Sequence, residues 1–145
     1  MKALLQRVKS ASVKIENELF SEIGAGLLVF VGVEKGDQKI NAKKLAEKIM
    51  NLRIFEDENG KMNLSLLDVK GEILIVSQFT LCGDCRKGTR PSFDKSAPID
   101  KAIELYQYFV EISKEYGLKT ATGKFQATMD VSLTNDGPVT FMLEK

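Results

Sequence analysis

The sequence contains no histidine among its 145 residues. Because an imidazole ring is the base in most serine and cysteine hydrolases, its absence excludes Ser-His and Cys-His arrangements as the source of any hydrolytic activity. Chemistry at an ester or amide would have to use hydroxyl groups, backbone amides, carboxylates, a lysine or the substrate itself.

The chain also lacks a dominant charge and a long apolar run. It has 21 Lys plus Arg against 20 Asp plus Glu, and this net charge of +1 creates no global field for or against nucleic acid. No run approaches the roughly 18 apolar residues of a membrane helix, and the first residues carry charge within their apolar stretch. We therefore expect a cytoplasmic protein without a membrane partner, folded as a single domain over residues 1–145.

Cysteine is scarce, and both cysteines lie in Cys82-Gly83-Asp84-Cys85. This C-x-x-C spacing is compatible with a redox dithiol or with half of a zinc site. A structural zinc site needs four ligands, and the chain has neither a second pair of cysteines nor a histidine. Gly88 and Pro91 interrupt any helix that could lower a thiol pKa. We interpret the two as incidental loop thiols and expect no metal and no cofactor.

The hydrophobic pattern predicts strands combined with two helices. Unbroken apolar runs at 27–33 and 73–76 indicate strands buried on both faces. A helix capped by Asp37 is predicted where apolar residues recur at three- and four-residue spacing: Ala42, Leu45, Ala46, Ile49 and Met50. A second helix is predicted from Ile99 to Tyr116, ended by Gly117.

The C-terminal region shows the two-residue alternation of a half-buried strand at 125–133. A turn is predicted at 135–138 and a last strand at 139–143, so that the chain would end in a hairpin. These elements together predict one α+β domain, with a curved or barrel-like, mainly antiparallel sheet and two main helices.

Two short motifs carry the most information about function. They are Ser77-Gln78-Phe79-Thr80-Leu81, after an apolar strand, and Asn135-Asp136-Gly137-Pro138-Val139-Thr140. Alone, each has an ordinary interpretation as a solvent-facing strand end or a turn. Together they resemble the motif pair of the D-aminoacyl-tRNA deacylases. The resemblance extends over essentially the whole chain through further segments: Gln6-Arg7-Val8, residues 22–28, residues 60–64 and Arg90-Pro91-Ser92-Phe93.

The resemblance implies a cytosolic homodimer that hydrolyses the ester between a D-amino acid, or glycine, and the terminal ribose of tRNA. Ser77, Gln78, Phe79 and Thr80 would line a pocket at the dimer interface. Gly137 and Pro138, joined by a cis peptide bond, would enter the active site of the partner subunit. No DNA partner is implied.

A backbone element suits chiral selection, because enantiomers carry the same groups and differ only in where the side chain lies. Discrimination must then come from a wall that excludes one of them. Gly137 lets main-chain atoms come close to a substrate, and Pro138 fixes φ. Such a wall cannot reject glycine, which has no side chain to exclude.

The chemistry of the first motif leaves alternatives. Thr80 is a candidate nucleophile, but an alcohol needs a base, and the nearby Asp84 and Arg86 have no evident geometry for that task. An aminoacyl ester is already activated and has a neighbouring ribose hydroxyl that can assist hydrolysis. We favour the backbone amides of Phe79 and Thr80 as oxyanion donors, with Ser77 and Gln78 shaping the pocket.

RNA contacts are expected from two regions. Arg86, Lys87 and Arg90 are interpreted as phosphate contacts or, alternatively, as a solvated loop. The resemblance places Phe125 and Met129 near the terminal adenosine, although such residues are more often core. Two other classes remain open: a non-enzymatic RNA-binding module and a threonine-dependent hydrolase of small esters or amides.

Overall fold

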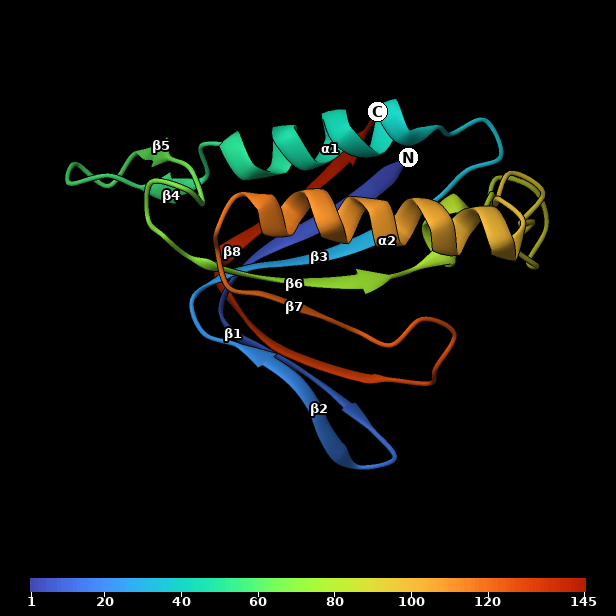
Figure 1. The fold of residues 1–145 in the computed structure, drawn as a ribbon, viewed down its shortest axis with the longest axis horizontal. Helices are drawn as coiled ribbons and strands as arrows, with labels where there is room; N and C mark the ends of the chain where they lie inside the picture. The colour runs from blue at the N-terminus through green and yellow to red at the C-terminus, as the bar shows by residue number, and fades with distance from the viewer.

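The computed structural model describes all 145 residues as two helices and a curved sheet. Helices α1 (Lys39–Asn51) and α2 (Ile99–Glu115) lie side by side over one face of the sheet (Figure 1). The sheet contains six strands: β1 (Lys2–Ile15), β2 (Glu18–Ile23), β3 (Gly26–Gly32), β6 (Glu72–Ser77), β7 (Thr120–Thr122) and β8 (Asp130–Glu144). A separate hairpin of β4 (Phe55–Glu56) and β5 (Met62–Leu64) projects at one end of the molecule (Figure 1).

Strand β1 organises the sheet, because it pairs antiparallel with β2, β3 and β8. The remaining pairs, β3 with β6 and β6 with β7, are parallel. The sheet bends strongly, so that β2 and the adjoining ends of β1 and β8 extend below the layer covered by the helices (Figure 1). The predicted fold class is confirmed: one α+β domain with a curved, mainly antiparallel sheet and two main helices.

The core forms on both faces of the central strands. All five residues of the predicted face of α1 are buried. In β3, Leu27 and Val29 pack into the cluster beneath the helices, whereas Leu28 packs into a second cluster on the opposite face. This two-sided burial explains the unbroken apolar runs. Neither α1 nor α2 has the length and apolar character that a membrane-spanning helix needs.

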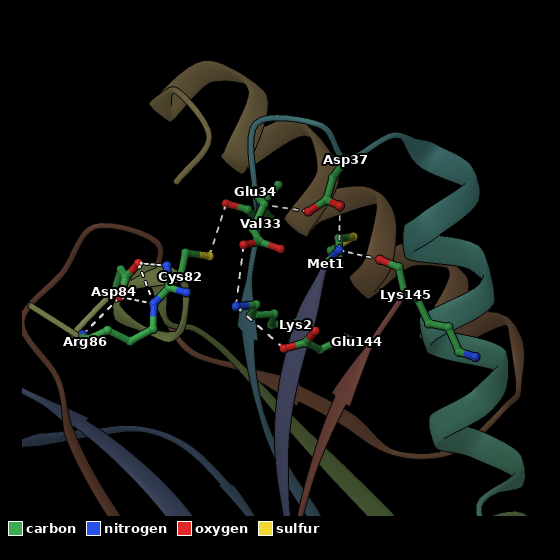
Figure 2. A network of polar contacts seen from close by, with 10 residues as sticks. All are labelled: Met1, Lys2, Val33, Glu34, Asp37, Cys82, Asp84, Arg86, Glu144 and Lys145. Carbon is green, nitrogen blue, oxygen red and sulfur yellow. Dashed lines mark hydrogen bonds and ion pairs between the residues drawn. The ribbon is translucent and has the colours of Figure 1, made fainter. Parts of the chain in front are cut away.

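Asp37 is not the N-cap of α1, and that prediction was wrong. The N-cap is Gln38, which forms a capping box with Asn41. The Asp37 carboxylate instead accepts hydrogen bonds from the ammonium group of Met1 (2.5 Å) and from the Glu34 N–H (2.6 Å) (Figure 2). The same ammonium group donates to the carbonyl of Lys145 at 2.5 Å. An ion pair with a distant residue has outweighed the local capping preference.

The predicted C-terminal hairpin was also wrong. Residues 125–129 belong to a loop, and β8 is one continuous strand that pairs with β1 on both sides of Gly137. The chain does not reverse there, because β1 offers an antiparallel partner along nearly its full length. The register passes from Gln6 opposite Thr140 to Val8 opposite Asn135. Residues 136–139 therefore form a bulge opposite Arg7.

Candidate active site

A pocket of about 600 Å³ lies where the parallel strands β3 and β6 end. Eleven of its 16 lining residues are hydrophobic, and they come from the end of β3, residues 76–79, the start of α2 and the loop before β8. This volume and mostly apolar lining, with a few polar groups, are typical of a small-molecule site.

The first motif forms one wall of this pocket. Ser77 ends β6, the Gln78 N–H donates to the Val31 carbonyl at 2.8 Å, and the chain then enters a short 3-10 helix, η1 (Phe79–Cys82). A side chain on Gly32 would place its Cβ 3.0 Å from the Cys82 sulfur and 3.1 Å from the Gln78 carbonyl oxygen. The absence of a side chain at Gly32 thus lets η1 pack against β3, which positions Ser77, Gln78 and Phe79 along the pocket.

The first backbone N–H groups of η1 are available to a ligand. Hydrogen bonding along η1 starts with the Leu81 N–H, which donates to the Gln78 carbonyl, and continues with the Gly83 N–H to the Thr80 carbonyl. The N–H groups of Phe79 and Thr80 consequently have no acceptor within the helix. They are free to donate to a negatively charged oxygen.

Thr80 is exposed and does not line the pocket. Its hydroxyl oxygen accepts a hydrogen bond from the Gln78 side-chain amide at 2.5 Å. An amide N–H is a donor and cannot remove the hydroxyl proton. The neighbouring Asp84 carboxylate is bound by the Arg86 side chain instead. The contacts of Thr80 are therefore not those of an activated nucleophile.

Phe125 and Met129 line the opposite wall of the pocket, in the loop between β7 and β8. Both are half-buried, and the Phe125 ring packs against that of Tyr106 with 5.8 Å between centroids. The Tyr106 hydroxyl donates to the Ile75 carbonyl at 2.9 Å, and burial raises its pKa to about 12. The structure thus brings Phe125 and Met129 together with Ser77, Gln78 and Phe79.

Gly137 and Pro138 lie outside this pocket, at the exposed tip of the bulge in β8. Their peptide bond is cis, as the resemblance implied. The Asn135 side chain closes the bulge, because its oxygen accepts from the Val139 N–H at 2.7 Å and its amide donates to the Val139 carbonyl at 3.1 Å. The bulge is therefore a well-defined projection on the surface of the protein.

Arg7 supports the bulge from below, and sequence reasoning gave it no role. It is only 4% exposed. Its guanidinium donates to the Asp136 carbonyl at 2.9 Å and to the Ile54 carbonyl at 2.7 Å, and it lies 3.4 Å from the Asp136 carboxylate. The available signals were its place in the Gln6-Arg7-Val8 segment of the resemblance and its position on the same face of β1 as the apolar Ala3 and Leu5. Arg7 is a positioning residue for Asp136 and Gly137.

The three basic residues that were interpreted as phosphate contacts lie in the loop after η1 and differ in their pairing. Arg86 forms an ion pair with Asp84 (Figure 2), and hydrogen bonds from Arg86 hold the pKa of that carboxyl group far below its usual range. Lys87 and Arg90 are exposed and form no salt bridge. Cys82 is buried, which raises its thiol pKa, and Cys85 is exposed; both are free thiols.

Comparison with known proteins identifies relatives over the full chain. A family model described as D-Tyr-tRNA(Tyr) deacylase matches residues 4–144. A protein of Thermosipho africanus named D-aminoacyl-tRNA deacylase is 62% identical over 99% of this chain and 97% of its own length. A protein of the same name from Pelobacter propionicus is 60% identical over 100% of both chains.

Two solved structures are similar in fold. One, titled c-Myc DNA Unwinding Element Binding Protein, has a TM-score of 0.94 at 42% identity and covers 100% of this chain and 99% of its own. The other, titled as a probable eukaryotic D-amino acid tRNA deacylase, has a TM-score of 0.87 at 17% identity over 99% of this chain and 98% of its own. With a family match over nearly every residue and relatives at about 60% identity, the chain belongs to the D-aminoacyl-tRNA deacylase family.

Proposed function

We propose that this protein is a cytoplasmic homodimer that hydrolyses the ester bond of D-aminoacyl-tRNA and of mischarged glycyl-tRNA, releasing the free amino acid and tRNA. The observation that carries this proposal is the pocket lined by Ser77, Gln78 and Phe79, together with a chain that belongs to the deacylase family. The pocket is large enough for a terminal nucleoside or an aminoacyl group.

The second motif is proposed to complete the pocket of the partner subunit. Gly137 and Pro138 are exposed and line no part of the pocket in their own chain. Arg7 and Asn135 nevertheless hold this projection firmly. A rigid, exposed backbone element remote from its own pocket is suited to enter the equivalent pocket of a second copy, where it would exclude the side chain of an L-amino acid.

Backbone amides are proposed to stabilise the reaction's oxyanion. The N–H groups of Phe79 and Thr80 have no acceptor within η1 and follow Gln78 directly in the chain, and Gln78, which lines the pocket, is held in place by its bond to Thr80. Preorganised donors of this kind lower the barrier to ester hydrolysis without a protein nucleophile. Phe125 and Met129 are proposed to contact the terminal adenosine.

Replacing Thr80 with alanine should leave at least about one tenth of kcat/KM, because the hydroxyl only accepts a bond from Gln78 and the backbone N–H is kept. Replacing the Thr80 N–H by an ester oxygen through semisynthesis should instead lower kcat by about 10²- to 10³-fold. Single-turnover kinetics on D-aminoacyl-tRNA would measure both. A trapped acyl-threonine would contradict the backbone mechanism. So would a loss of nearly all activity in Thr80→Ala when the ester-for-amide replacement has no such effect.

The loop cations are proposed to contact tRNA phosphates, with Lys87 and Arg90 contributing more than Arg86, whose charge is paired with Asp84. Replacing all three with alanine should reduce the slope of log affinity against log salt by about 1.4, the effect of two phosphate contacts on a single strand. Arg86→Ala alone should change the slope little. Titration of tRNA binding over a range of salt concentrations would measure it, with a Lys43→Ala/Lys44→Ala double variant on α1 as the control. An unchanged slope of log affinity against log salt would instead indicate that these residues belong to a solvated loop that does not contact tRNA.

The activity itself is tested by offering the purified protein four substrates: D-aminoacyl-tRNA, glycyl-tRNA, L-aminoacyl-tRNA and a free D-amino acid ester. The proposal expects rapid release of amino acid from the first two only. Stoichiometric binding without turnover would favour an RNA-binding module. Equal turnover of the free ester would favour a hydrolase of small molecules.

A further inference from the structure

Two exposed aromatic rings contact each other at the mouth of the pocket. Phe79 is 57% exposed although it lines the pocket, so its ring lies at the rim. Phe93 is 37% exposed, and its ring centroid lies 5.0 Å from that of Phe79 with 57° between the planes. The pair is therefore a preformed aromatic surface that continues from the pocket toward solvent.

The position of Phe93 is fixed by the backbone around it. Asp84 and Ser92 exchange two backbone hydrogen bonds of 2.8 and 3.0 Å, and the Phe93 carbonyl accepts from the Ser96 N–H at 2.9 Å. The Phe93 ring lies against Gly83, where an added Cβ would come within 3.0 Å of a ring carbon. A hydrophobic ring held in this way without being buried is suited to contact a ligand.

Positive charge lies in the loop that leads into Phe93. Lys87 and Arg90 occupy the tip of the loop closed by Asp84 and Ser92, and neither forms a salt bridge. Aromatic rings for stacking, combined with unpaired cations for the backbone, are the two components of surfaces that bind single-stranded nucleic acid. An apolar protein segment would use the rings but not the cations.

We propose that the Phe79–Phe93 pair stacks the base of the nucleotide that precedes the terminal nucleotide of tRNA. This inference rests on the proposed function, since it requires the terminal nucleoside and its amino acid to occupy the pocket. The chain of the RNA then leaves the pocket over Phe79, its next base rests on the two rings, and its phosphates pass Lys87 and Arg90. The pair is a binding subsite that distinguishes tRNA from a free aminoacyl-nucleoside.

The test compares D-aminoacyl-tRNA with D-aminoacyl-adenosine, which lacks the preceding nucleotide. Phe93→Leu keeps an apolar side chain but removes the aromatic face, and should raise KM for the tRNA about fivefold or more, at the lower end of the range for one stacked base. Hydrolysis of D-aminoacyl-adenosine should not change. Phe93→Tyr should retain the wild-type KM, and Phe20→Leu, at a similarly exposed ring on β2, is the matched control.

A tRNA whose penultimate nucleotide lacks its base provides a second test of the stacking. It should raise KM for the wild-type enzyme as much as Phe93→Leu does, and should add nothing further in that variant. Independent, additive effects would overturn the proposal, as would an equal loss on D-aminoacyl-adenosine. A change in dimer dissociation without coupling to the abasic site would assign the rings to a subunit interface instead. Failure of the wild type to hydrolyse either substrate would refute the proposed function, which separates the two outcomes.

Discussion

Replacing Gly137 with alanine is expected to lower kcat/KM for D-aminoacyl-tRNA by about 100-fold or more, the cost typical of misplacing a site by an ångström. The new Cβ would lie 2.6 Å from Cγ2 of Val139 and 2.9 Å from its nitrogen, so the backbone of the bulge must move. Gly137 also has φ of +144°, which L-residues rarely adopt. Steady-state kinetics with matched thermal melts would separate lost activity from unfolding. Gly36→Ala is the control, because nothing lies within 4 Å of its Cβ position.

Mixed dimers make this result specific to the cross-subunit proposal. One subunit carries Gly137→Ala and the other carries Gln78→Ala in the pocket. Both defects should then fall in one active site, leaving the second site active and selective for D-aminoacyl-tRNA. Two equally damaged sites, or a monomer with full activity and selectivity, would contradict the proposal.

Replacing Arg7 with methionine is expected to reduce the free energy of unfolding by about 3 kcal/mol, because the buried Ile54 carbonyl and the partly buried Asp136 carbonyl lose a charged donor. The bulge should also become mobile, so that L-aminoacyl-tRNA is hydrolysed more readily relative to the D-ester. Chemical denaturation and the ratio of kcat/KM for the two enantiomers would measure these effects.

The matched control is Arg53→Met. Arg53 also donates to a backbone carbonyl, that of Asn63 at 2.7 Å, but it is exposed and donates to no residue of the bulge. The Arg53→Met variant should lose little free energy of unfolding, and its ratio of kcat/KM for the D- and L-esters should not change. Loss of stability in Arg7→Met with full rejection of the L-ester would restrict Arg7 to a purely structural role.

Local patterns predicted the elements that depend on local burial. The apolar face of α1 and the runs at 27–33 and 73–76 were correctly assigned, because helices and buried strands impose their periodicity on the sequence. The continuous β8 was missed, because its course is set by pairing with β1 at the other end of the chain. A glycine and a proline favour a turn locally but not against such a partner.

In the candidate site, too, features set by local sequence could be predicted, whereas features set by contacts between distant residues could not. The first motif could be placed at the end of a buried strand, and the pocket does form there. The role of Arg7 and the pairing of Arg86 with Asp84 depend on contacts that hydrophobic periodicity does not encode. The exposure of Phe93 beside Phe79 likewise follows from how the loop folds back on η1.

The pairing of β1 with β8 has a consequence for biosynthesis. Lys2 lies opposite Glu144. The central strand β1 therefore leaves the ribosome early, and its partner β8 is synthesised more than a hundred residues later. Contacts so distant in sequence form late and slowly. Until then the edge of β1 that β8 covers is open to other strands, a hazard for aggregation. The bulge at Gly137 and Pro138 forms in the same late step, so a nascent chain that lacks β8 also lacks the element proposed to exclude L-aminoacyl esters.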